Sequence, residues 1–431
     1  MIQFITADNI EYLKTLTDNS VHAIVTDPPY GIGFMGKEWD TFKTKYLEEK
    51  LVSESKRRPL ADARTSTGFQ NSVYAGTYDL SLSGNMKFQQ WFYEISVELF
   101  RVLKPGGYFL SFCGCRTYHR MASAIEDAGF EIRDQMQWVF GSGFPKSLNV
   151  EKAGAGKEWK GWGTALKPAN EPICVARKPL EKGLTVAQNV LKYGTGAVNI
   201  DGCRISLNGE EPPTGSAKRV FANNSYNEQA TYGTNTETNA LGRFPANIIF
   251  DEAAAKLLDE QTGTLTSGAM KKQYDYTNNG FAFGKPVGKT NHLCEANEGG
   301  ASRFFYCAKA SKSERNKGLE NMVAKKRDHV LEHGQAGTDN PFNRGAQEVV
   351  NHHPTVKPIK LMQYLVRLVT PTGGTVIDPF AGSGTTGIAC NLEGFDAILI
   401  DREEEYTELQ KHRCAAWEPE KEPIDNQLSI F

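Results

Sequence analysis

Apolar and polar residues alternate along the chain in a way that predicts α/β structure at its N-terminal end. Residues 2–6 and 21–26 are short apolar runs typical of strands, and the residues between them are spaced as in a helix that Asp8 or Asn9 would cap. Strand, helix and strand within so few residues indicate a parallel sheet. Further elements are predicted as helices at 91–103 and 118–128 and strands at 108–113, 131–140 and 173–176.

A second α/β block is predicted near the C-terminal end. Leu361, Leu365 and Leu368 share one face of a helix at 360–370. A strand, a helix, a strand and a last helix follow, at 375–377, 385–392, 397–400 and from 406 onward. The α/β pattern therefore returns after a long interruption.

Two segments interrupt the pattern. Residues 37–87 are rich in charges and then in Ser, Thr, Gly and Asn, and are predicted to form a long loop that acts as a lid or substrate arm. Residues 181–350 contain mostly small and polar residues with short apolar segments, which indicates a loop-rich insertion. The predicted organisation is therefore an α/β part at 1–180, the insertion at 181–350, a second α/β part at 351–415 and a polar tail at 416–431.

The strand at 21–26 ends in the turn Asp27-Pro28-Pro29-Tyr30. The prolines fix their own φ angles, remove two backbone donors and keep the preceding residues extended. The turn therefore holds a carboxylate and an aromatic ring beside backbone carbonyls that no local N–H group can reach. A flat molecule with an amino group would find acceptors and a stacking surface here. By itself, the turn is explained equally well as an ordinary strand end.

A glycine-containing loop joins the strand at 375–377 to the following helix. Such glycines let the backbone approach a ligand, the helix N-terminus offers free N–H groups, and an acid at the end of the next strand can accept from ribose hydroxyls. This combination predicts a nucleoside-cofactor site. The spacing of Gly382, Gly384 and Gly387 also fits a nicotinamide-dependent dehydrogenase, so that alternative stays open. The candidate cofactor residues here are Asp378, Phe380, Ala381, Gly382, Ser383, Gly384, Thr385 and Asp401.

The charge of the chain restricts how a nucleic acid would bind. The formal net charge of the 431 residues is −2, so such a partner needs local basic patches. Residues 303–327 have an excess of basic side chains, which is typical either of a phosphate-contacting surface or of a solvated face. The candidate DNA contacts in this run are Lys312, Arg315, Lys325, Lys326 and Arg327.

Other features favour a cytoplasmic protein without a metal. The eight cysteines are scattered, and the one close pair, Cys113 and Cys115, has a poor spacing for zinc. No apolar run is long enough to cross a bilayer, and the first residues lack the pattern of a secretory signal. We therefore predict no metal site and no membrane partner.

The two constellations together resemble the S-adenosylmethionine-dependent amino-methyltransferases of DNA. In that family a D-P-P-Y turn orients the target amino group and an F-x-G-x-G loop binds the cofactor. Their order here resembles the beta class, a circular permutation in which the catalytic turn precedes the cofactor loop. The resemblance covers residues 1–180 and 353–415, and the residues between fall where the family has its target-recognition domain.

Two further matches support the resemblance, and one position departs from the usual residue of the family. The segment from His353 to Pro358 is similar to the family segment that lines the methionine end of the cofactor, which assigns Thr355 and Lys357 to cofactor binding. Asp8 matches the family acid that contacts the cofactor adenine, and Asp401 stands where the family usually has Glu. The implied fold is a circularly permuted, Rossmann-like methyltransferase sheet of the α/β class with an inserted, loop-rich target-recognition domain.

The resemblance implies a site-specific methyltransferase that modifies the N6 amino group of adenine in double-stranded DNA by base flipping. Tyr30 would stack on the flipped base, while the Asp27 carboxylate and the Pro28 carbonyl accept the amino hydrogens. N4-cytosine is the alternative target, because members with that activity more often have Ser at the position of Asp27. A dehydrogenase and a DNA-binding protein without catalysis are alternatives of other classes. The family also implies a bacterial or phage origin, and allows a homodimer and a cognate restriction endonuclease as partners.

Overall fold

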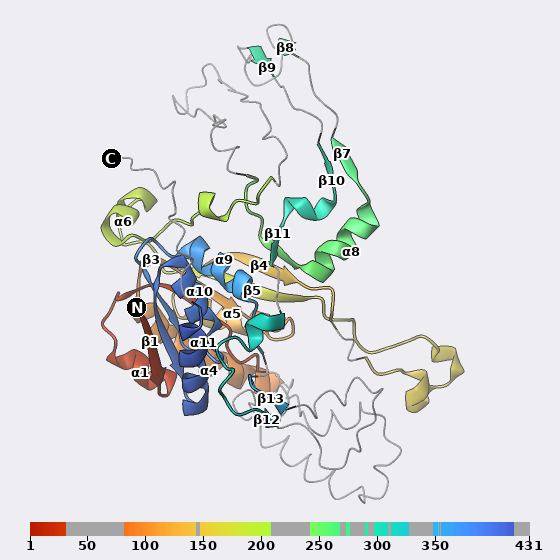
Figure 1. The fold of residues 1–431 in the computed structure, drawn as a ribbon, viewed down its shortest axis with the longest axis horizontal. Helices are drawn as coiled ribbons and strands as arrows, with labels where there is room; N and C mark the ends of the chain where they lie inside the picture. The colour runs from red at the N-terminus through yellow and green to blue at the C-terminus, as the bar shows by residue number, and fades with distance from the viewer. Residues whose placement is uncertain are drawn as a thin grey trace, which may run out of the picture. The chain divides into compact units, whose positions relative to one another are not determined.

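The chain forms two compact units in the computed structural model (Figure 1). The first unit contains residues 1–138, 143–198 and those from 308 onward, and the second contains residues 139–142 and 199–307. The second unit is smaller than the insertion predicted at 181–350, because the described residues near both ends of that range belong to the first unit. The structure describes residues 1–31, 82–143, 147–207, 242–267, 273–275, 289–291, 297–308, 312–326, 348–351, 353 and 355–417.

The first unit is built on a sheet that interleaves strands from the two ends of the chain (Figure 1). Its strands lie in the order β1 (Ile2–Thr6), β15 (Asp396–Asp401), β14 (Thr375–Asp378), β2 (Val21–Thr26), β3 (Leu103–Phe112), β5 (Asn170–Arg177) and β4 (Glu131–Val139). The pairs from β1 to β3 are parallel, whereas β5 is antiparallel to β3. Two C-terminal strands therefore separate β1 from β2. This order confirms the predicted α/β class and its circular permutation.

The register of β14 against β2 brings the two candidate motifs to one edge of the sheet. Val376 lies opposite Ala23, and Ile377 lies opposite Ile24. Because the strands are parallel, the segments that follow them leave at the same edge. The turn that starts at Asp27 and the loop that starts after Asp378 therefore lie side by side, although some 350 residues separate them in sequence.

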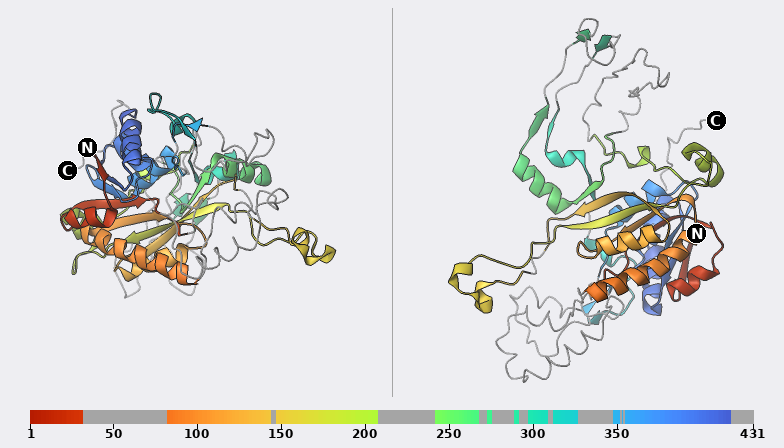
Figure 2. Two further views of the ribbon diagram at one scale, coloured as in Figure 1. Left: turned by 90° about the horizontal axis from the view of Figure 1, so that it is seen from below. Right: turned by 180° about the vertical axis from the view of Figure 1, so that it is seen from behind.

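Helices cover both faces of this sheet (Figure 2). The helices α1, α4 and α5 lie on one face, and their apolar side chains, such as Leu13, Phe92 and Ile125, form one buried cluster with Ile24 and Phe109 of the strands. The helices α9, α10 and α11 lie on the other face (Figure 2). The bounds are α1 Asn9–Thr15, α4 Leu82–Val102, α5 Tyr118–Asp127, α6 Val186–Tyr193, α9 Ile359–Val369, α10 Thr385–Glu393 and α11 Glu404–Ala415.

One helix starts earlier than its sequence pattern predicts. α4 begins at Leu82 rather than at residue 91, so the end of the loop predicted at 37–87 is helical; residues 37–81 lie outside the described part of the chain. The reason is tertiary packing, which overrides weak helix propensity. Phe88 is fully buried, and its ring approaches so closely that a Cβ at Gly31 would lie 2.7 Å from it. The extra turns of α4 therefore support the turn that follows β2.

The connection between β4 and β5 is a long hairpin, which we call the arm, defined as residues 147–167. An isolated bridge joins Asn149 to Gly163, and the tip contains two short helical segments, Glu151–Ala155 and Lys157–Trp159. The arm extends away from the sheet in all three views (Figures 1 and 2). The remaining short elements of the first unit are Lys312–Arg315, β12 (Lys325–Lys326) and β13 (Glu348–Val349).

The second unit has short elements, as expected for a loop-rich segment. Asp251 caps its longest described helix, α8, by accepting from the Ala254 N–H, and Asp259 of that helix accepts from the Ser302 N–H and hydroxyl. Its elements are Asp201–Cys203, β6 (Ile248–Asp251), α8 (Glu252–Thr262), β7 (Leu265–Ser267), β8 (Gln273–Asp275), β9 (Lys289–Asn291), β10 (Asn297–Gly299), Ala301–Phe304 and β11 (Tyr306–Ala308).

Candidate active site

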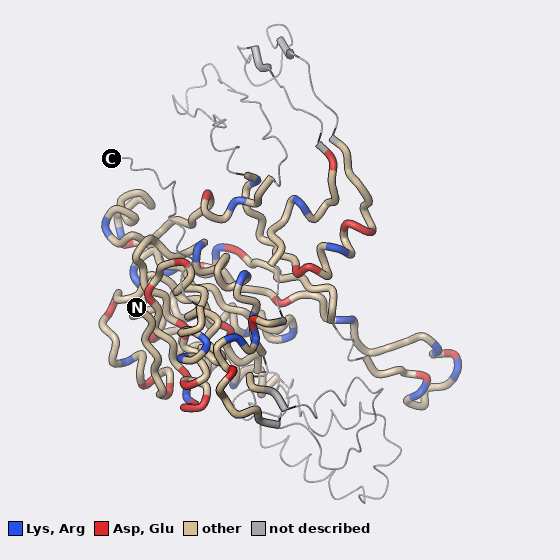
Figure 3. The backbone as a smooth tube through the Cα atoms, in the orientation of Figure 1, with Lys and Arg blue, Asp and Glu red and all other residues tan. Residues whose placement is uncertain are grey.

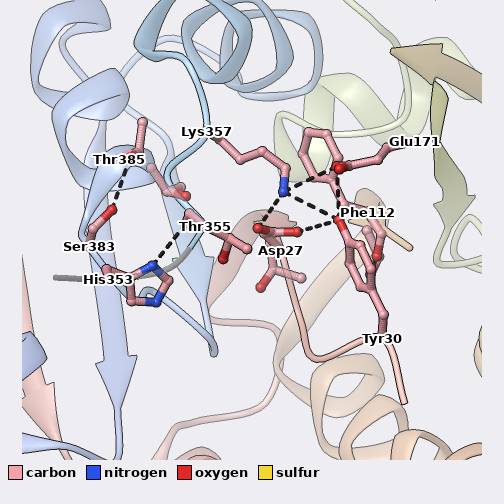
Figure 4. Close-up of polar contacts among 12 residues, drawn as sticks. Asp27, Tyr30, Phe112, Glu171, His353, Thr355, Lys357, Ser383 and Thr385 are labelled. Carbon is pink, nitrogen blue, oxygen red and sulfur yellow. Dashed lines mark hydrogen bonds and ion pairs between the residues drawn. The ribbon is translucent and has the colours of Figure 1, made fainter. Parts of the chain in front are cut away.

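The turn after β2 places the Asp27 carboxylate between two donors (Figure 4). Oδ1 accepts from the Tyr30 hydroxyl at 2.8 Å, and Oδ2 accepts from Lys357 Nζ at 2.5 Å. Pro28 and Pro29 hold the backbone extended between the acid and the ring. No donor contacts the Pro28 carbonyl among the residues that the structure describes. The turn thus presents one backbone carbonyl and one carboxylate, and the carboxylate already accepts from two donors.

Tyr30 is fixed at both its backbone and its hydroxyl. Its carbonyl accepts from Thr117 Oγ1 at 2.6 Å, and its hydroxyl lies 3.0 Å from Glu171 Oε2 as well as close to Asp27. Burial, together with the negative charges of Asp27 and Glu171, raises the pKa of Tyr30 well above its usual value. The phenol therefore keeps its proton and acts as a donor.

Lys357, predicted to bind the cofactor, lies between the carboxylates of Asp27 and Glu171. Its Nζ is 2.5 Å from Asp27 and 3.2 Å from Glu171, and it lies 4.9 Å from the centre of the Phe112 ring. Burial lowers the pKa of Lys357, but the charges of Asp27 and Glu171 and hydrogen bonds to both outweigh it, so the net shift is upward. The ammonium is therefore retained in a buried position.

Glu171 is the member of this cluster that the sequence did not indicate. It is the second residue of β5 and lies 141 positions after Tyr30. The residues Glu171-Pro172 start an ordinary apolar strand, and no local pattern relates them to the turn at Asp27. Only the pairing of β5 with β3 brings the carboxylate to the site.

Asp378, at the end of β14, connects the two motifs. Its buried carboxylate accepts from the Thr26 hydroxyl at 2.5 Å, the Thr386 hydroxyl at 2.5 Å and the Phe380 N–H at 3.1 Å. Burial raises the pKa of Asp378 to about 6, although these hydrogen bonds act in the opposite direction. All three contacts are internal, so Asp378 fixes the loop against the strand that carries Asp27.

The glycines of the loop allow close backbone approach. Gly384 has φ +79° and caps α10, and Gly382 has φ +50°. A Cβ at Gly382 would lie 2.6 Å from His353 Nε2. The Gly382 N–H donates to Asp401 Oδ2 at 2.9 Å, while Asp401 Oδ1 accepts from the Glu403 N–H at 3.0 Å. Burial raises the pKa of Asp401 to about 6.

Side chains of helix α11 form hydrogen bonds with the glycine loop at 382–385, and the sequence did not indicate these residues. The fully buried Arg413 donates to the Ser383 carbonyl at 2.6 Å, to the Ser383 hydroxyl at 2.9 Å and to the Thr385 hydroxyl at 3.2 Å. Gln410 donates to the Gly382 carbonyl at 3.2 Å. The side chains of Ser383 and Thr385, which were predicted to bind cofactor, therefore point into the protein.

The segment before α9 packs on the same loop. His353 Nδ1 lies 2.8 Å from the Thr355 carbonyl, and its ring lies 4.8 Å from that of Tyr406. Burial lowers the pKa of His353 to about 4. Arg315, predicted to contact DNA, donates to the His353 carbonyl at 2.6 Å. Its guanidinium therefore helps to fix this segment.

The remaining candidate residues are more scattered. Asp8 caps α1 by accepting from the Glu11 N–H at 3.2 Å. The Phe380 ring packs on Trp91 at 5.6 Å, and Ala381 is buried. Of the predicted DNA contacts, Lys312, Lys325 and Lys326 lie in short elements, and the structure does not describe the side chains of these three lysines. Arg327 lies outside the described residues.

Two absences apply to the described part of the chain. It contains no group of three or more His, Cys, Asp or Glu residues that could hold a metal ion. No helix in it is long and apolar enough to cross a membrane.

Comparison with known proteins connects this geometry to a family. The family model described as DNA methylase matches residues 21–412. The type II methyltransferase M.HindIII of Haemophilus influenzae is 29% identical over 208 residues, which are 45% of this chain and 63% of that protein. The type II methyltransferase M2.DpnII of Streptococcus pneumoniae is 41% identical over 64 residues, which are 15% and 24% of the two chains. The chain therefore spans less than two thirds of the length of these curated relatives.

Solved structures of low similarity were also found. The M1.HpyAVI–SAM complex is 17% identical with a TM-score of 0.37, covering 96% of this chain and 100% of that chain. The cytosine-N4-specific PvuII DNA methyltransferase is 13% identical with a TM-score of 0.43, covering 96% and 87% of the two chains. The family model, which matches most of the chain and includes both the turn at Asp27 and the loop at Gly382, is the stronger finding. On that match, the chain belongs to the N6/N4 family of DNA methylases.

Proposed function

We propose that this protein transfers a methyl group from S-adenosylmethionine to an exocyclic amino group of a base in DNA. One observation carries the proposal. The turn at Asp27 and the glycine loop after Asp378 leave neighbouring parallel strands at the same edge, and the Thr26–Asp378 hydrogen bond of 2.5 Å joins them. Membership of the DNA methylase family supports the same reaction class.

The residues at the end of β14 fit a nucleoside cofactor. Gly382 and Gly384 have left-handed backbones, and the Asp401 carboxylate is oriented by two backbone N–H groups at the end of β15. Gly387 allows α10 to pack closely, because a Cβ there would lie 2.4 Å from Leu399. When bound, S-adenosylmethionine supplies an electrophilic methyl group.

The residues after β2 would act on the amino group. An exocyclic amine is a weak nucleophile because its lone pair is delocalised into the ring, and in a duplex it is also buried in the stack, so the base must be flipped out. The Asp27 carboxylate and the Pro28 carbonyl would accept the two amino hydrogens and localise the lone pair. The same acceptors stabilise the positive charge that develops on nitrogen. Tyr30 would stack on the flipped base.

Adenine N6 is the proposed target and cytosine N4 the second candidate. The argument for adenine is Asp27, since the N4-cytosine members that the motif resembles more often have Ser there. Double-stranded DNA is the proposed partner. A homodimer and a cognate endonuclease remain predictions.

A product analysis tests the proposal. Unmethylated genomic DNA is incubated with the protein and S-adenosylmethionine carrying a labelled methyl group, digested to nucleosides and separated by mass. We expect labelled N6-methyladenine. Labelled N4-methylcytosine would overturn the choice of adenine, and absence of any labelled nucleoside would overturn the methyltransferase itself.

The dehydrogenase alternative has its own test. A ligand that binds the folded state at a hundred times its Kd stabilises it by about 2.7 kcal/mol. S-adenosylmethionine should therefore raise the melting temperature, and NADH should not. The reverse result would favour the dehydrogenase.

A further inference from the structure

The Tyr30 hydroxyl lies near two carboxylates, those of Asp27 and Glu171 (Figure 4). Because it has a single proton, it can donate to one of them at a time. The hydroxyl lies 2.8 Å from Asp27 Oδ1 and 3.0 Å from Glu171 Oε2. The proposed reaction needs Asp27 as the acceptor of an amino hydrogen. A carboxylate oxygen that already accepts from a phenol is a weaker acceptor for a second donor.

We propose that Glu171 is a positioning residue that takes over the Tyr30 hydroxyl when the target amino group binds to Asp27; this rests on the proposed function. The two acceptor distances differ by 0.2 Å, so the hydroxyl changes partner by rotating its hydrogen, with little movement of the ring. Asp27 Oδ1 then becomes free for the amine. No covalent bond is made or broken in this exchange.

The charges around the hydroxyl favour the exchange. Lys357 pairs with Asp27 at 2.5 Å and with Glu171 at 3.2 Å, so its ammonium contacts both acceptors. Two carboxylates and one ammonium leave one negative charge in a partly buried cluster. That charge complements the positive charge that develops on the amine.

A double-mutant cycle tests the exchange. Glu171→Ala should lower kcat for methyl transfer by at least about tenfold, the size expected when a hydrogen bond to a charged group is removed. Tyr30→Phe removes the competing proton but keeps the stacking ring, so it should retain kcat within a few fold. In the Tyr30→Phe background, Glu171→Ala should then cost much less. Glu171→Gln keeps a carbonyl acceptor and should lie between wild type and Glu171→Ala.

The controls separate the possible failures. The matched control is Glu131, whose carboxylate lies 2.7 Å from the guanidinium of Arg177, a residue of the same strand as Glu171. Glu131→Ala removes this carboxylate and should leave kcat unchanged. The melting shift caused by S-adenosylmethionine should be equal in all variants. An equal effect of Glu171→Ala in both backgrounds, or loss of activity in Tyr30→Phe, would overturn the exchange. A wild-type protein that methylates no DNA would instead overturn the proposed function.

The arm carries a second, independent inference. It exposes aromatic and aliphatic side chains that a soluble hairpin normally avoids: Trp162 is 61% exposed and Leu166 is 92% exposed. The rings of Trp159 and Trp162 contact each other edge to face at 5.2 Å. The arm carries the exposed lysines Lys152, Lys157 and Lys160, together with the acids Glu151 and Glu158. Figure 3 shows basic and acidic positions along it.

The C-terminal end of the arm is close in sequence to the candidate active site. The arm ends at residue 167, and Glu171 is the second residue of β5, which starts at Asn170. Lysines beside exposed indoles match the phosphates and base or sugar surfaces of DNA. The geometry points to the arm as a surface that contacts double-stranded DNA beside the flipped base, which again rests on the proposed function.

Salt-dependent binding tests the arm. Changing Lys152, Lys157 and Lys160 together to Gln should weaken DNA binding and reduce the slope of log K against log salt by about 0.9 for each phosphate that is no longer neutralised. Trp159→Ala with Trp162→Ala should raise the KM for DNA more than it lowers kcat. The matched control, Lys14, Lys192 and Lys411 to Gln, removes the same charge from other surfaces and should leave the slope nearly unchanged.

The outcomes for the arm are distinct. An arm variant with the wild-type slope and KM would overturn the inference. A tryptophan variant that no longer self-associates, or no longer binds anionic lipid vesicles, while binding DNA normally would assign the arm to a different partner and also overturn it. A wild-type protein that binds no DNA would overturn the proposed function.

Discussion

At the scale of single residues, the structure of the candidate site depends on the pairing of the Lys357 ammonium with two carboxylates. Asp27 faces Lys357 and Tyr30, and Lys357 is shared with Glu171. Removing one charge from such a buried pair leaves the other uncompensated, which costs far more than the pair contributes. Substitutions at Lys357 should therefore affect both stability and catalysis. Tyr30→Phe instead removes a neutral hydroxyl, which donates to Asp27 at 2.8 Å and accepts from Lys357 Nζ at 3.3 Å.

His353 gives a pH prediction. Its pKa falls from 6.5 to about 4 because the ring is buried, and the ring lies close to Gly382 of the glycine loop. As the pH falls from 6.5 to 4, the unfolded chain binds a proton that the folded state does not, so the free energy of unfolding decreases. The decrease should reach about 3 kcal/mol for this group. Urea unfolding from pH 7 to 4 measures it, and His353→Gln should flatten the profile relative to wild type. Profiles of equal steepness would contradict the prediction.

At the scale of elements, the sequence predicted the sheet but not the supports of the loop. Strands β1, β2, β14 and β15 are short apolar runs followed by polar turns, and their pattern was sufficient. Arg413 and Gln410 could not be predicted, because α11 has no clear apolar stripe and buries these polar side chains beside Leu409 and Cys414. Glu171 was missed because only strand pairing brings it near Tyr30.

The role of α11 predicts a defined effect of one substitution. Arg413→Met should remove the hydrogen bonds to the Ser383 carbonyl and hydroxyl and leave buried acceptors unpaired. We expect a loss of stability of about 3 kcal/mol and weaker binding of S-adenosylmethionine. Urea unfolding and titration calorimetry measure the two effects. Lys411→Met, on the exposed face of the same helix, is the control, and a variant with wild-type cofactor affinity would contradict the account.

At the scale of the whole molecule, a chain with net charge −2 that acts on DNA, as proposed, would contact it through local basic surfaces. Arg315, one of the basic residues selected from the sequence, is bonded to the His353 carbonyl. The sequence alone cannot tell whether a basic side chain bonds to a backbone carbonyl, as Arg315 does, or is available for a phosphate. The proposed DNA contacts were therefore the least predictable residues of the site. The prediction for Lys325, Lys326 and Arg327 remains to be tested.

Those three residues predict a change in salt dependence. Replacing Lys325, Lys326 and Arg327 together by Gln should weaken DNA binding and lower the salt slope, if they contact phosphates. Fluorescence anisotropy at several salt concentrations measures both. Arg315→Gln should instead lower the melting temperature and leave the slope nearly unchanged. An unchanged slope in the triple variant would move the phosphate contacts to other surfaces, such as the arm.

The central claim is that the turn at Asp27 and the loop at Gly382 form one site for methyl transfer. The most direct test is the rate at which wild type and Asp27→Ala transfer a labelled methyl group from saturating S-adenosylmethionine to unmethylated DNA, with cofactor affinity measured on the same preparations. We predict that Asp27→Ala loses transfer to DNA while its affinity for S-adenosylmethionine stays close to that of wild type. Transfer by Asp27→Ala at the wild-type rate would contradict the account.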